Sequence, residues 1–471
     1  MEDRGKGENA AGSPGAQALA ALLDPQSSIL DPRPPPHRIV IVGGGAGGLE
    51  LATRLGNTLG KRKLAHVQLV DRLDTHVWKP LLHEVAAGSL DINAHQLDYL
   101  AQARWHHFAF RPGALLGLDR ARREITVSAV HDDEGLEILP QRALPYDTLV
   151  IAIGCLTNTF NTPGVADHAI CLDSAPEAER FHRKLVAACV RADGRIAAGP
   201  GAGRSRINVA IIGAGATGVE LAAELRNTTE LLASYGLDHL DPARDVSLTV
   251  IEAGPRILAP LAERVSKATH ELLEKMSVTV FVNERVTEVT ADAVITQSGK
   301  RIASDLTVWS AGVRAADVLA TLDGLEVNRA NQLVVRQTLQ ATLDDNVFAF
   351  GDCAACPWPE KKSQVPPRNA AAHQQASLLA KSLRRRLQGK RLAEFHYRDF
   401  GSLVSLGEAS AVGNLMGALI GGSLFIEGLI AWWTYISLYK LHQIALHGLF
   451  NVTMDTIANL IRRTTPRVKL H

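Results

Sequence analysis

"RIVIVGGGAGGLELA" at residues 38–52 has a near copy, "NVAIIGAGATGVELA", at residues 208–222. Each copy has a short apolar run, then Gly-x-Gly-x-x-Gly, then an Ala-, Leu- and Glu-rich segment that favours a helix, expected over 49–59 in the first copy and 218–234 in the second. A strand that enters a glycine turn and leaves it as a helix begins a βαβ unit. The repeat therefore predicts two such units far apart in the chain, whose first turn glycines are Gly43 and Gly213.

The glycines of these turns have distinct tasks. The first permits a tight bend, the second lets the backbone approach a pyrophosphate, and the third lets the helix pack on the strand, while the helix N-terminus stabilises the anion. A single motif of this kind is also typical of an ordinary glycine-rich loop, but two copies, each between a strand and a helix, predict two dinucleotide sites. The candidate residues are Gly43, Gly45, Gly47 and Gly48 in the first turn and Gly213, Gly215 and Gly218 in the second.

An acidic residue follows each turn at the end of a second apolar run. Asp71 closes "HVQLVD" (66–71), and Glu252 follows "SLTVI" (247–251). An acid there binds the ribose diol and repels a 2′-phosphate, so the second site is predicted to take NADH and not NADPH. Glu252 lies farther from its glycine turn than is usual, because "NTTELLASYGLDHLDPARD" intervenes after the helix begins.

Two dinucleotide sites in one chain suggest a flavin ring held beside a nicotinamide, so that hydride passes directly between them. "NVFAFGDCA" (346–354) supports FAD, bound non-covalently, at the first site. Its Gly351-Asp352 turn resembles the turn whose Asp binds the ribitol and pyrophosphate region of FAD in two-dinucleotide flavoproteins. The alternative is that Asp352 only caps the next helix.

These segments predict an α/β protein with two Rossmann-like dinucleotide-binding domains, the second inserted into the first, and a C-terminal region that associates with a membrane. The N-terminal segment is rich in Gly, Ala and Pro and has no apolar core of a signal peptide, which predicts a disordered tail. The expected boundaries are 1–36 (tail), 37–165 (first part of the FAD domain), 166–345 (NADH domain), 346–400 (return part of the FAD domain, with a helix from 370 to 387) and 401–471 (C-terminal region).

Composition sets further limits. The chain has 471 residues, 46% hydrophobic, and a formal net charge of +1, which gives no indication of nucleic-acid binding. Its five scattered cysteines predict free thiols in a reducing compartment. Cys353 and Cys356 have the C-x-x-C spacing of redox pairs, but disulfide reductases carry their pair soon after the first glycine turn, where this chain has no cysteine. We therefore interpret Cys353 and Cys356 as small buried thiols.

The C-terminal part of the chain, from residue 409 onward, carries the membrane signal. Residues 409–426 contain no charge, but several Gly residues and an Asn interrupt them and Glu427 follows, so we expect strands and loops there and no membrane span. "AWWTYISLYKLH" (431–442) concentrates aromatic residues that favour the headgroup level. One helical face then collects apolar side chains, namely Leu446, Phe450, Met454, Ile457 and Ile461.

The apolar face and the basic C-terminal end predict a helix that lies on an anionic membrane surface. The alternative is an ordinary amphipathic helix docked on the protein core or on a second subunit. Membrane contact makes a lipid-soluble quinone a natural electron acceptor.

From about Arg38 to His471 the chain resembles the type II (alternative, non-proton-pumping) NADH:quinone dehydrogenases, especially their proteobacterial branch. The resemblance rests on the two glycine turns and on "WKPLLHEVAAGSLD" (78–91), "YDTLVIAIGCLTNTFNTPGV" (146–165), "WSAGVRA" (309–315), "FGDCAACP" (350–357), "PPRNAAAHQQA" (366–376) and "YISLYKLHQIALHG" (435–448). It implies FAD in the first domain and NADH in the second. It also implies a ubiquinone or menaquinone acceptor, and a peripheral homodimer on the cytoplasmic side of the inner membrane.

The resemblance also assigns roles to single residues. Glu220 matches the Glu that lies near flavin and nicotinamide and is linked to hydride-transfer geometry or quinone protonation; it is the predicted catalytic residue. Lys79 and Pro80 match the segment that lines the isoalloxazine, with His83 and Glu84 following. Ala311 and Gly312 match the turn near the nicotinamide.

The quinone-site stretch corresponds to "PPRNAAAHQQ" (366–375). The family usually has a Gln where this chain has Ala370, while Gln374 is retained. Asn369, His373 and Gln374 are therefore the predicted quinone contacts. For His373, a proton donor and a polar helix residue both remain open. No metal site is predicted.

Three alternatives remain open from the residues alone. A sulfide:quinone reductase would use Cys155 with Cys353 or Cys356. A pyridine nucleotide-disulfide reductase would reduce disulfides and ignore quinones. A membrane-bound flavoprotein that senses NADH would show flavin reduction without turnover.

Overall fold

The computed structural model describes residues 35–198, 206–399, 401–405, 411–416, 423–427, 437, 439–440, 442–446 and 448–461. Almost all of the tail predicted for residues 1–36 lies outside the described residues, as do the aromatic residues 431–436 and the basic end 462–471.

The first glycine turn follows the central strand of a six-stranded sheet. β1 (His37–Val42) lies between β2 (Ala65–Asp71) and β11 (Thr148–Ile151), and every pairing of these three strands is parallel. The sheet order is β23-β24-β11-β1-β2-β5, completed by β5 (Ala109–Pro112), β24 (Asp344–Ala349) and the antiparallel edge strand β23 (Gln340–Ala341). The inner strands are apolar along their length because both sheet faces are covered.

The second glycine turn has the same position in a second parallel sheet. The order of this sheet is β13-β20-β14-β15-β16. Its strands are β13 (Ala169–Cys171), β14 (Ile207–Ile212), β15 (Val246–Ile251), β16 (Val278–Phe281) and β20 (Leu306–Trp309). These two parallel sheets confirm the predicted α/β class with two Rossmann-like units.

Two antiparallel strands lie where the chain passes between the two parallel sheets. β12 (Cys155–Thr157) leaves the first sheet, and β21 (Val313–Ala315) follows the last strand of the second and pairs with it. Smaller antiparallel sheets flank both units: β6 (Leu115–Asp119), β7 (Glu124–Val127) and β10 (Arg142–Pro145); β8 (Val130–His131) and β9 (Glu137–Leu139); β17 (Val286–Val289), β18 (Ala293–Thr296) and β19 (Arg301–Ala303).

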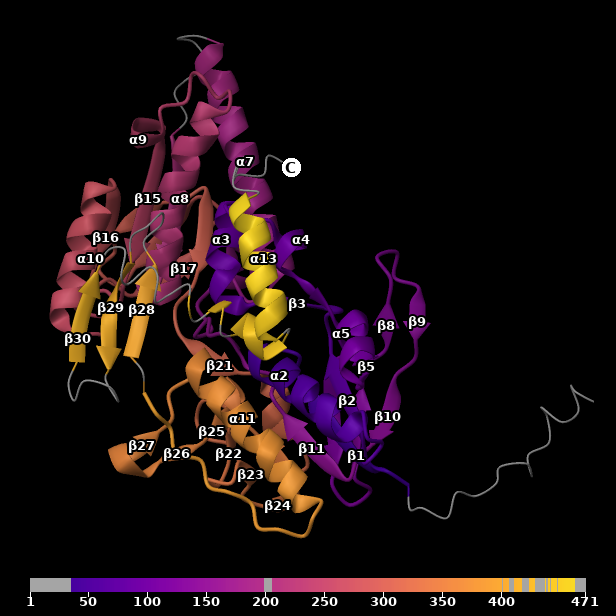
Figure 1. The fold of residues 1–471 in the computed structure, drawn as a ribbon. Helices are drawn as coiled ribbons and strands as arrows, with labels where there is room; N and C mark the ends of the chain where they lie inside the picture. Colours follow the sequence, from indigo (N-terminus) through magenta and orange to yellow (C-terminus); the bar gives the residue numbers. More distant parts are fainter. Residues whose placement is uncertain are drawn as a thin grey trace, which may run out of the picture. The chain divides into compact units, whose positions relative to one another are not determined.

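Helices α2 (Ala46–Leu55) and α11 (Asn369–Arg386) lie side by side on the first unit, and Figure 1 shows both in front of its sheet. In the second unit α8 (Ala216–Ser234) contacts the short α3 (Leu82–Ala87), which also packs on α7 (Ala175–Ala197). The remaining helices include α4 (Ile92–His95), α5 (Tyr99–His106), α9 (Pro242–Asp245) and α10 (Glu263–Lys275).

Both glycine-turn helices begin earlier than the apolar pattern predicts. The expected starts are Leu49 and Gly218, whereas the structure starts α2 at Ala46 and α8 at Ala216. The caps are Gly45 and Gly215, so the last residues of each glycine turn are already helical. The first helix also ends sooner than expected, because its continuation to Gly60 is a π-helical turn, Gly56–Gly60.

The C-terminal region contains a three-stranded antiparallel sheet, β28 (Gly401–Ser405), β29 (Ala411–Met416) and β30 (Ser423–Glu427), and the helix α13 (Leu449–Ile461). Strands therefore occupy the uncharged stretch, as expected. The proposed single apolar face is wrong for Leu446, which is buried in the core of the first unit. Gly448, with φ +80°, separates it from α13, so the two segments do not form one helix.

Among the described residues, no helix combines the length and the apolar character that crossing a bilayer requires.

Candidate active site

The backbone of the two glycine turns is nearly identical. Gly43 and Gly213 have φ of +104° and +99°, which an L-side chain rarely adopts. A Cβ on Gly48 would lie 1.8 Å from the Gly43 carbonyl oxygen, and one on Gly218 would lie 2.0 Å from that of Gly213. The protein itself therefore requires glycine at these four positions.

The middle glycines are different. A Cβ on Gly45 or Gly215 would meet nothing within 4 Å, and both residues have negative φ. Each caps a helix whose first turn carries no acidic side chain. Space in front of an unopposed helix N-terminus fits a pyrophosphate, because the backbone N–H groups and the helix dipole both stabilise an anion there.

The two acids also occupy equivalent places. The Asp71 carboxylate accepts the backbone N–H of Gly44 at 2.5 Å, and the Glu252 carboxylate accepts that of Ala214 at 2.8 Å. The longer interval before Glu252 has no effect on this position, because β15 pairs with β14 as β2 pairs with β1. Burial raises the pKa of Asp71, although hydrogen bonds from Leu73 and Gly44 oppose that shift.

One cavity of about 730 Å³ brings most of the predicted residues together. Its lining includes Lys79, Pro80, Gly215, Glu220, Gly312, Asp352, Asn369, His373 and Gln374. The other turn glycines, Asp71, Glu252, Gly351 and Ala311 are not part of that wall. Ala311 instead lies against Gly213, where it shapes the turn.

Glu220 lies on α8, one turn after the second glycine turn, and only 6% of it is exposed. Its Oε2 lies 3.7 Å from Nδ1 of His83 on α3. Burial lowers the pKa of His83 to about 4, so this histidine is neutral at neutral pH. The contact is therefore between a carboxyl group and a neutral imidazole, and not an ion pair.

Glu84, the residue after His83, has a pKa well above that of an ordinary glutamate. Burial raises its pKa to about 7, and the nearby Glu224 of α8 adds to the shift. Tyr439 of the C-terminal region lies close enough for Glu84 to raise the pKa of its hydroxyl, although burial is the main cause. The sequence assigned Glu84 no function and placed Tyr439 among the aromatic residues of the headgroup level, whereas its ring packs on Trp78 and its hydroxyl lies 3.0 Å from His95 Nδ1.

Lys79 and Asp352 approach Cys155 from two sides. Lys79 Nζ donates to the Cys155 carbonyl oxygen at 3.0 Å, and the Cys155 thiol donates to Asp352 Oδ2 at 3.3 Å. Burial, reinforced by Asp352, raises the pKa of this thiol far above its ordinary value. The arrangement gives Asp352 a place in the cavity, as a cofactor ligand requires, and keeps Cys155 protonated.

The three predicted quinone contacts differ in their exposure and in the hydrogen bonds that they already make within the protein. Asn369 is the exposed first residue of α11. The amide of Gln374 donates to the Arg398 carbonyl and accepts the Arg398 N–H, at 2.9 and 3.1 Å. Gln374 therefore fixes the chain at residue 398, and Asn369 and His373 remain the polar candidates. His373 Nδ1 lies 2.6 Å from Glu50 Oε2.

Glu50 is the residue that the sequence reasoning missed. It is fully buried on α2 and lines the cavity. Its carboxylate also accepts from Arg54 at 2.7 Å and from Ser377 at 3.2 Å. The repeat itself contained the signal, since Glu50 in "GLELA" and Glu220 in "GVELA" stand at the same position after the first glycine of each copy.

All five cysteines are free thiols. Cys353 and Cys356 are fully buried, and burial raises the pKa of each thiol to about 12. Because the thiolate is the reactive form, neither cysteine is poised for thiol chemistry.

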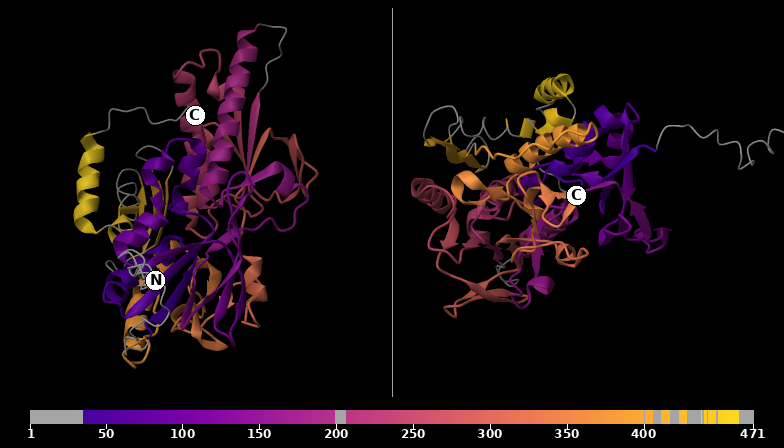
Figure 2. Two further views of the ribbon diagram at one scale, coloured as in Figure 1. Left: turned by 90° about the vertical axis from the view of Figure 1, so that its right-hand side faces the viewer. Right: turned by 90° about the horizontal axis from the view of Figure 1, so that it is seen from below.

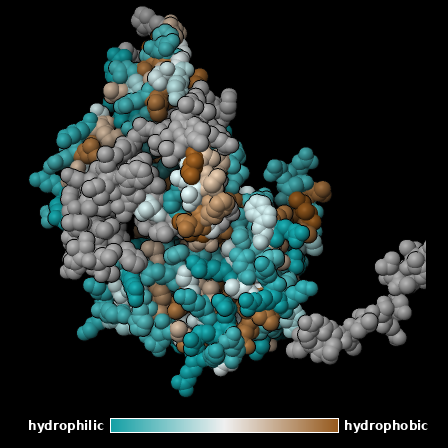
Figure 3. Space-filling model, in the orientation of Figure 1, coloured by the Kyte–Doolittle hydropathy of each residue, from teal (hydrophilic) through white to brown (hydrophobic). Residues whose placement is uncertain are grey.

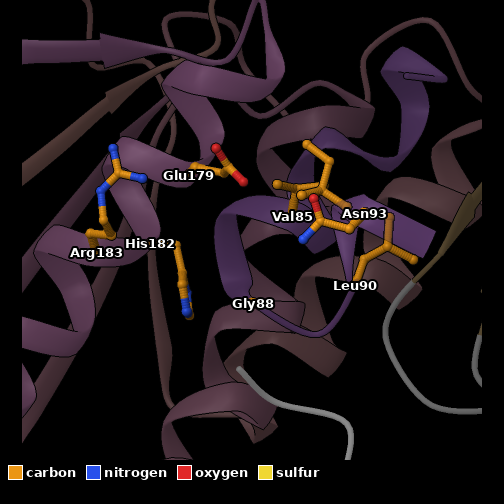
Figure 4. A pocket seen from close by; sticks show the side chains of 8 residues that line it. Val85, Gly88, Leu90, Asn93, Glu179, His182 and Arg183 are labelled. Atoms are coloured by element: carbon orange, nitrogen blue, oxygen red, sulfur yellow. The ribbon is translucent and has the colours of Figure 1, made fainter. Parts of the chain in front are cut away.

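A second cavity of about 300 Å³ lies between α3, α4 and α7. Figure 4 shows the Glu179 side chain of α7 directed toward the segment from Val85 to Asn93, with His182 and Arg183 on the same helix. None of the predicted site residues lines it. The candidate active site is therefore the larger cavity.

The comparisons with known proteins show the family of the chain. The family described as Pyridine nucleotide-disulphide oxidoreductase matches residues 37–376, and the chain belongs to it. Within this family the chain is 44% identical to the type II NADH:quinone oxidoreductase of Haemophilus influenzae, over 92% of this chain and 99% of that protein. The chain is thus a member of the type II NADH:quinone oxidoreductase family, which confirms the predicted family.

Two solved structures show the same fold. NDH2 from Plasmodium falciparum in complex with NADH is 18% identical, with a TM-score of 0.76 over 92% of this chain and 99% of that chain. The sulfide:quinone oxidoreductase of Aquifex aeolicus is also 18% identical, with a TM-score of 0.67 over 88% and 92% of the two chains.

Proposed function

We propose that this protein oxidises NADH and reduces a lipid quinone, with FAD as its bound cofactor and without pumping protons. Membership of the type II family supports the reaction. The observation that carries it is the single cavity in which the second glycine turn, the Lys79 segment and the α11 residues meet, because the hydride donor and the electron acceptor must reach one flavin.

The first unit has the groups that FAD needs. The open space at Gly45 suits its pyrophosphate, Asp71 suits its ribose, and Asp352 suits its ribitol region. Lys79 and Pro80 line the cavity where the isoalloxazine would lie. When bound, FAD supplies the hydride and electron chemistry, and the protein supplies alignment and electrostatics.

The second unit has the groups that NADH needs. Gly215 leaves room for the pyrophosphate, and Gly312 and Glu220 line the cavity on the nicotinamide side. The Glu252 carboxylate, fixed by Ala214 and Gly254, would accept the ribose hydroxyls and repel a 2′-phosphate. This arrangement supports NADH over NADPH.

The quinone is ubiquinone or menaquinone, and it would enter at the α11 wall past Asn369 and His373. We further propose that the protein is peripheral on the cytoplasmic side of the inner membrane, as a homodimer. Helix α13 supports the membrane contact, because Phe450 is largely exposed and Met454 and Ile457 are about half exposed. Figure 3 shows apolar side chains over this helix, and Figure 2 shows it at the margin of the molecule.

Anaerobic stopped-flow absorbance tests the reaction directly. The detergent-purified holoenzyme is mixed with NADH and the flavin band is followed, and the reduced enzyme is then mixed with a short-chain ubiquinone. We expect NADH to bleach the band and the quinone to restore it. If NADH bleaches the band and only a disulfide or oxygen restores it, the acceptor is wrong. If sulfide bleaches it and NADH does not, the sulfide enzyme replaces this proposal.

The cysteine chemistry of the alternatives has a separate test. The protonated state of Cys353 and Cys356 supports a reaction that needs neither of them. Replacing both with alanine should leave NADH:quinone turnover within about twofold, because a buried, inert thiol contributes packing and no chemistry. A loss of turnover with the flavin still bound would instead support the sulfide:quinone or disulfide reductase. An NADH-sensing flavoprotein would show flavin reduction by NADH but no reoxidation by quinone.

A further inference from the structure

Two glutamates occupy the same position of the internal repeat and line the same cavity. Glu50 is the fifth residue of α2 and Glu220 the fifth residue of α8, and both are buried. Each lies beside a histidine from another element. His83 approaches Glu220 at 3.7 Å and is buried, whereas His373 approaches Glu50 at 2.6 Å with 43% of its side chain exposed.

The reaction itself needs a proton. Reduction of a quinone to a quinol by NADH consumes one hydride and one proton, so each turnover takes up one proton that NADH does not provide. His83 is a poor source because burial keeps it neutral. His373 lies in the cavity wall and is open to solvent, so it has access to both the acceptor and a proton reservoir.

We propose that His373 donates this proton to a quinone oxygen and that Glu50 is the positioning residue that holds its imidazole for the transfer. The inference rests on the proposed quinone reductase function and assigns a step at the same site. Nδ1 of His373 donates to Glu50, so Nε2 is the nitrogen that gives up its proton. The imidazole is then neutral and takes a new proton from water.

The side chains around His373 and Glu50 fit these two roles. Arg54 and Ser377 hold the Glu50 carboxylate, which fixes its orientation toward α11. The other charged groups on this part of the wall already have partners. Arg368 pairs with Asp399 at 3.0 Å, Lys79 donates to a carbonyl oxygen, and Asp352 accepts from Cys155. Glu220 lines the cavity from the second unit.

The test separates the two half-reactions in the holoenzyme. His373→Asn and Glu50→Gln are compared with wild type by the stopped-flow assay, using short-chain ubiquinone. His396→Asn is the matched control, because His396 pairs with Glu360 at 2.9 Å but both side chains are exposed and neither lines the cavity. FAD content and melting temperature establish that each variant is folded.

We expect flavin reduction by NADH to be unchanged in all variants. Reoxidation by quinone should slow on the order of 100-fold in His373→Asn and about tenfold in Glu50→Gln, the range of general acid catalysis and of lost positioning. In wild type, reoxidation should be slower in deuterated water than in ordinary water, because the step transfers a proton. Added imidazole should speed reoxidation in His373→Gly, which a purely structural histidine would not allow.

The outcomes are distinguishable. If wild-type flavin is not reoxidised by quinone at all, the proposed function fails. If quinone reoxidises wild type, His373→Asn and His396→Asn at the same rate, with the same isotope effect, the proton-donor role is overturned while the function stands. Slow reoxidation of His373→Asn without rescue of His373→Gly by imidazole also overturns it, in favour of a binding role. If Glu50→Gln does not fold, the His373 variants still test the proton-donor role.

Discussion

At the scale of single residues, the glycines of each turn divide into two kinds. Gly218 has no room for a Cβ because the Gly213 carbonyl lies 2.0 Å from its position, while Gly215 has open space. The first kind is required by the fold, whereas the second has the open space that the proposed pyrophosphate contact needs. The same division holds for Gly48 and Gly45 in the first turn.

This contrast predicts two different phenotypes. Gly215→Ala should keep its FAD and its melting temperature but bind NADH at least tenfold more weakly, because the methyl group enters the pyrophosphate space. Gly218→Ala should unfold at a lower temperature, because overpacking against a carbonyl costs roughly 1–3 kcal/mol. Thermal unfolding and NADH titration of the two holoenzyme variants measure both effects. Equal NADH affinity in Gly215→Ala and wild type would contradict the pyrophosphate assignment.

At the scale of elements, α13 presents side chains that water does not favour. Phe450 is 76% exposed, and Met454 and Ile457 are about half exposed, whereas Val452 on the other side is buried. The hairpin of β8 and β9 also exposes Leu136 and Ile138. Figure 3 shows both apolar areas on one face. The predicted amphipathic character favours α13 as the proposed membrane contact.

Phe450→Glu with Ile457→Glu should release the protein from vesicles that contain anionic phosphatidylglycerol. Each lost apolar contact is worth about 1.5–3 kcal/mol, or roughly tenfold or more in the partition coefficient. Co-sedimentation measures binding, and NADH oxidation with a soluble quinone should persist. The matched control is Leu136→Glu with Ile138→Glu. Loss of binding in the control and not in the α13 variant would place the membrane contact at the hairpin.

At the scale of the whole molecule, Glu84 of α3 lies close enough to Glu224 of α8 and to Tyr439 of the C-terminal region for their charges to interact. Its pKa in the folded protein is about 7, above its ordinary 4.5, because of burial and then Glu224. A raised carboxyl pKa means that the folded state holds a proton that the unfolded chain has released. The free energy of unfolding should therefore fall as the pH rises from about 4.5 to 7, by up to about 3 kcal/mol.

Glu84→Gln should remove this pH dependence, because the amide does not titrate. The melting temperature of the variant should exceed that of wild type at pH 8, and the difference should shrink toward pH 5. Glu230→Gln, an exposed position on α8, is the control. If wild type and Glu84→Gln lose the same stability between pH 5 and pH 8, burial does not raise this pKa.

Much of the architecture could be predicted because its signals are local. A glycine turn between an apolar strand and a helix is readable within a single short stretch such as 38–52, and the repeat showed that it occurs twice. Asp71 could also be predicted, because its spacing follows from the length of a βαβ unit, whereas Glu252 was identified by its place at the end of the second apolar run. The starts of α2 and α8 were missed by a few residues because the turn glycines are already helical.

The sequence by itself determined two Rossmann-like units, their order and the dinucleotide turns, because local propensity and short-range spacing specify these features. Only the tertiary structure decided which side chains share the cavity. Glu50 and His373 are far apart in the chain and meet because α11 packs on α2, and Gln374 turned out to bind the backbone of Arg398. Such contacts depend on how the elements pack against one another, and the burial that shifts the pKa values of His83 and Glu84 exists only after that packing.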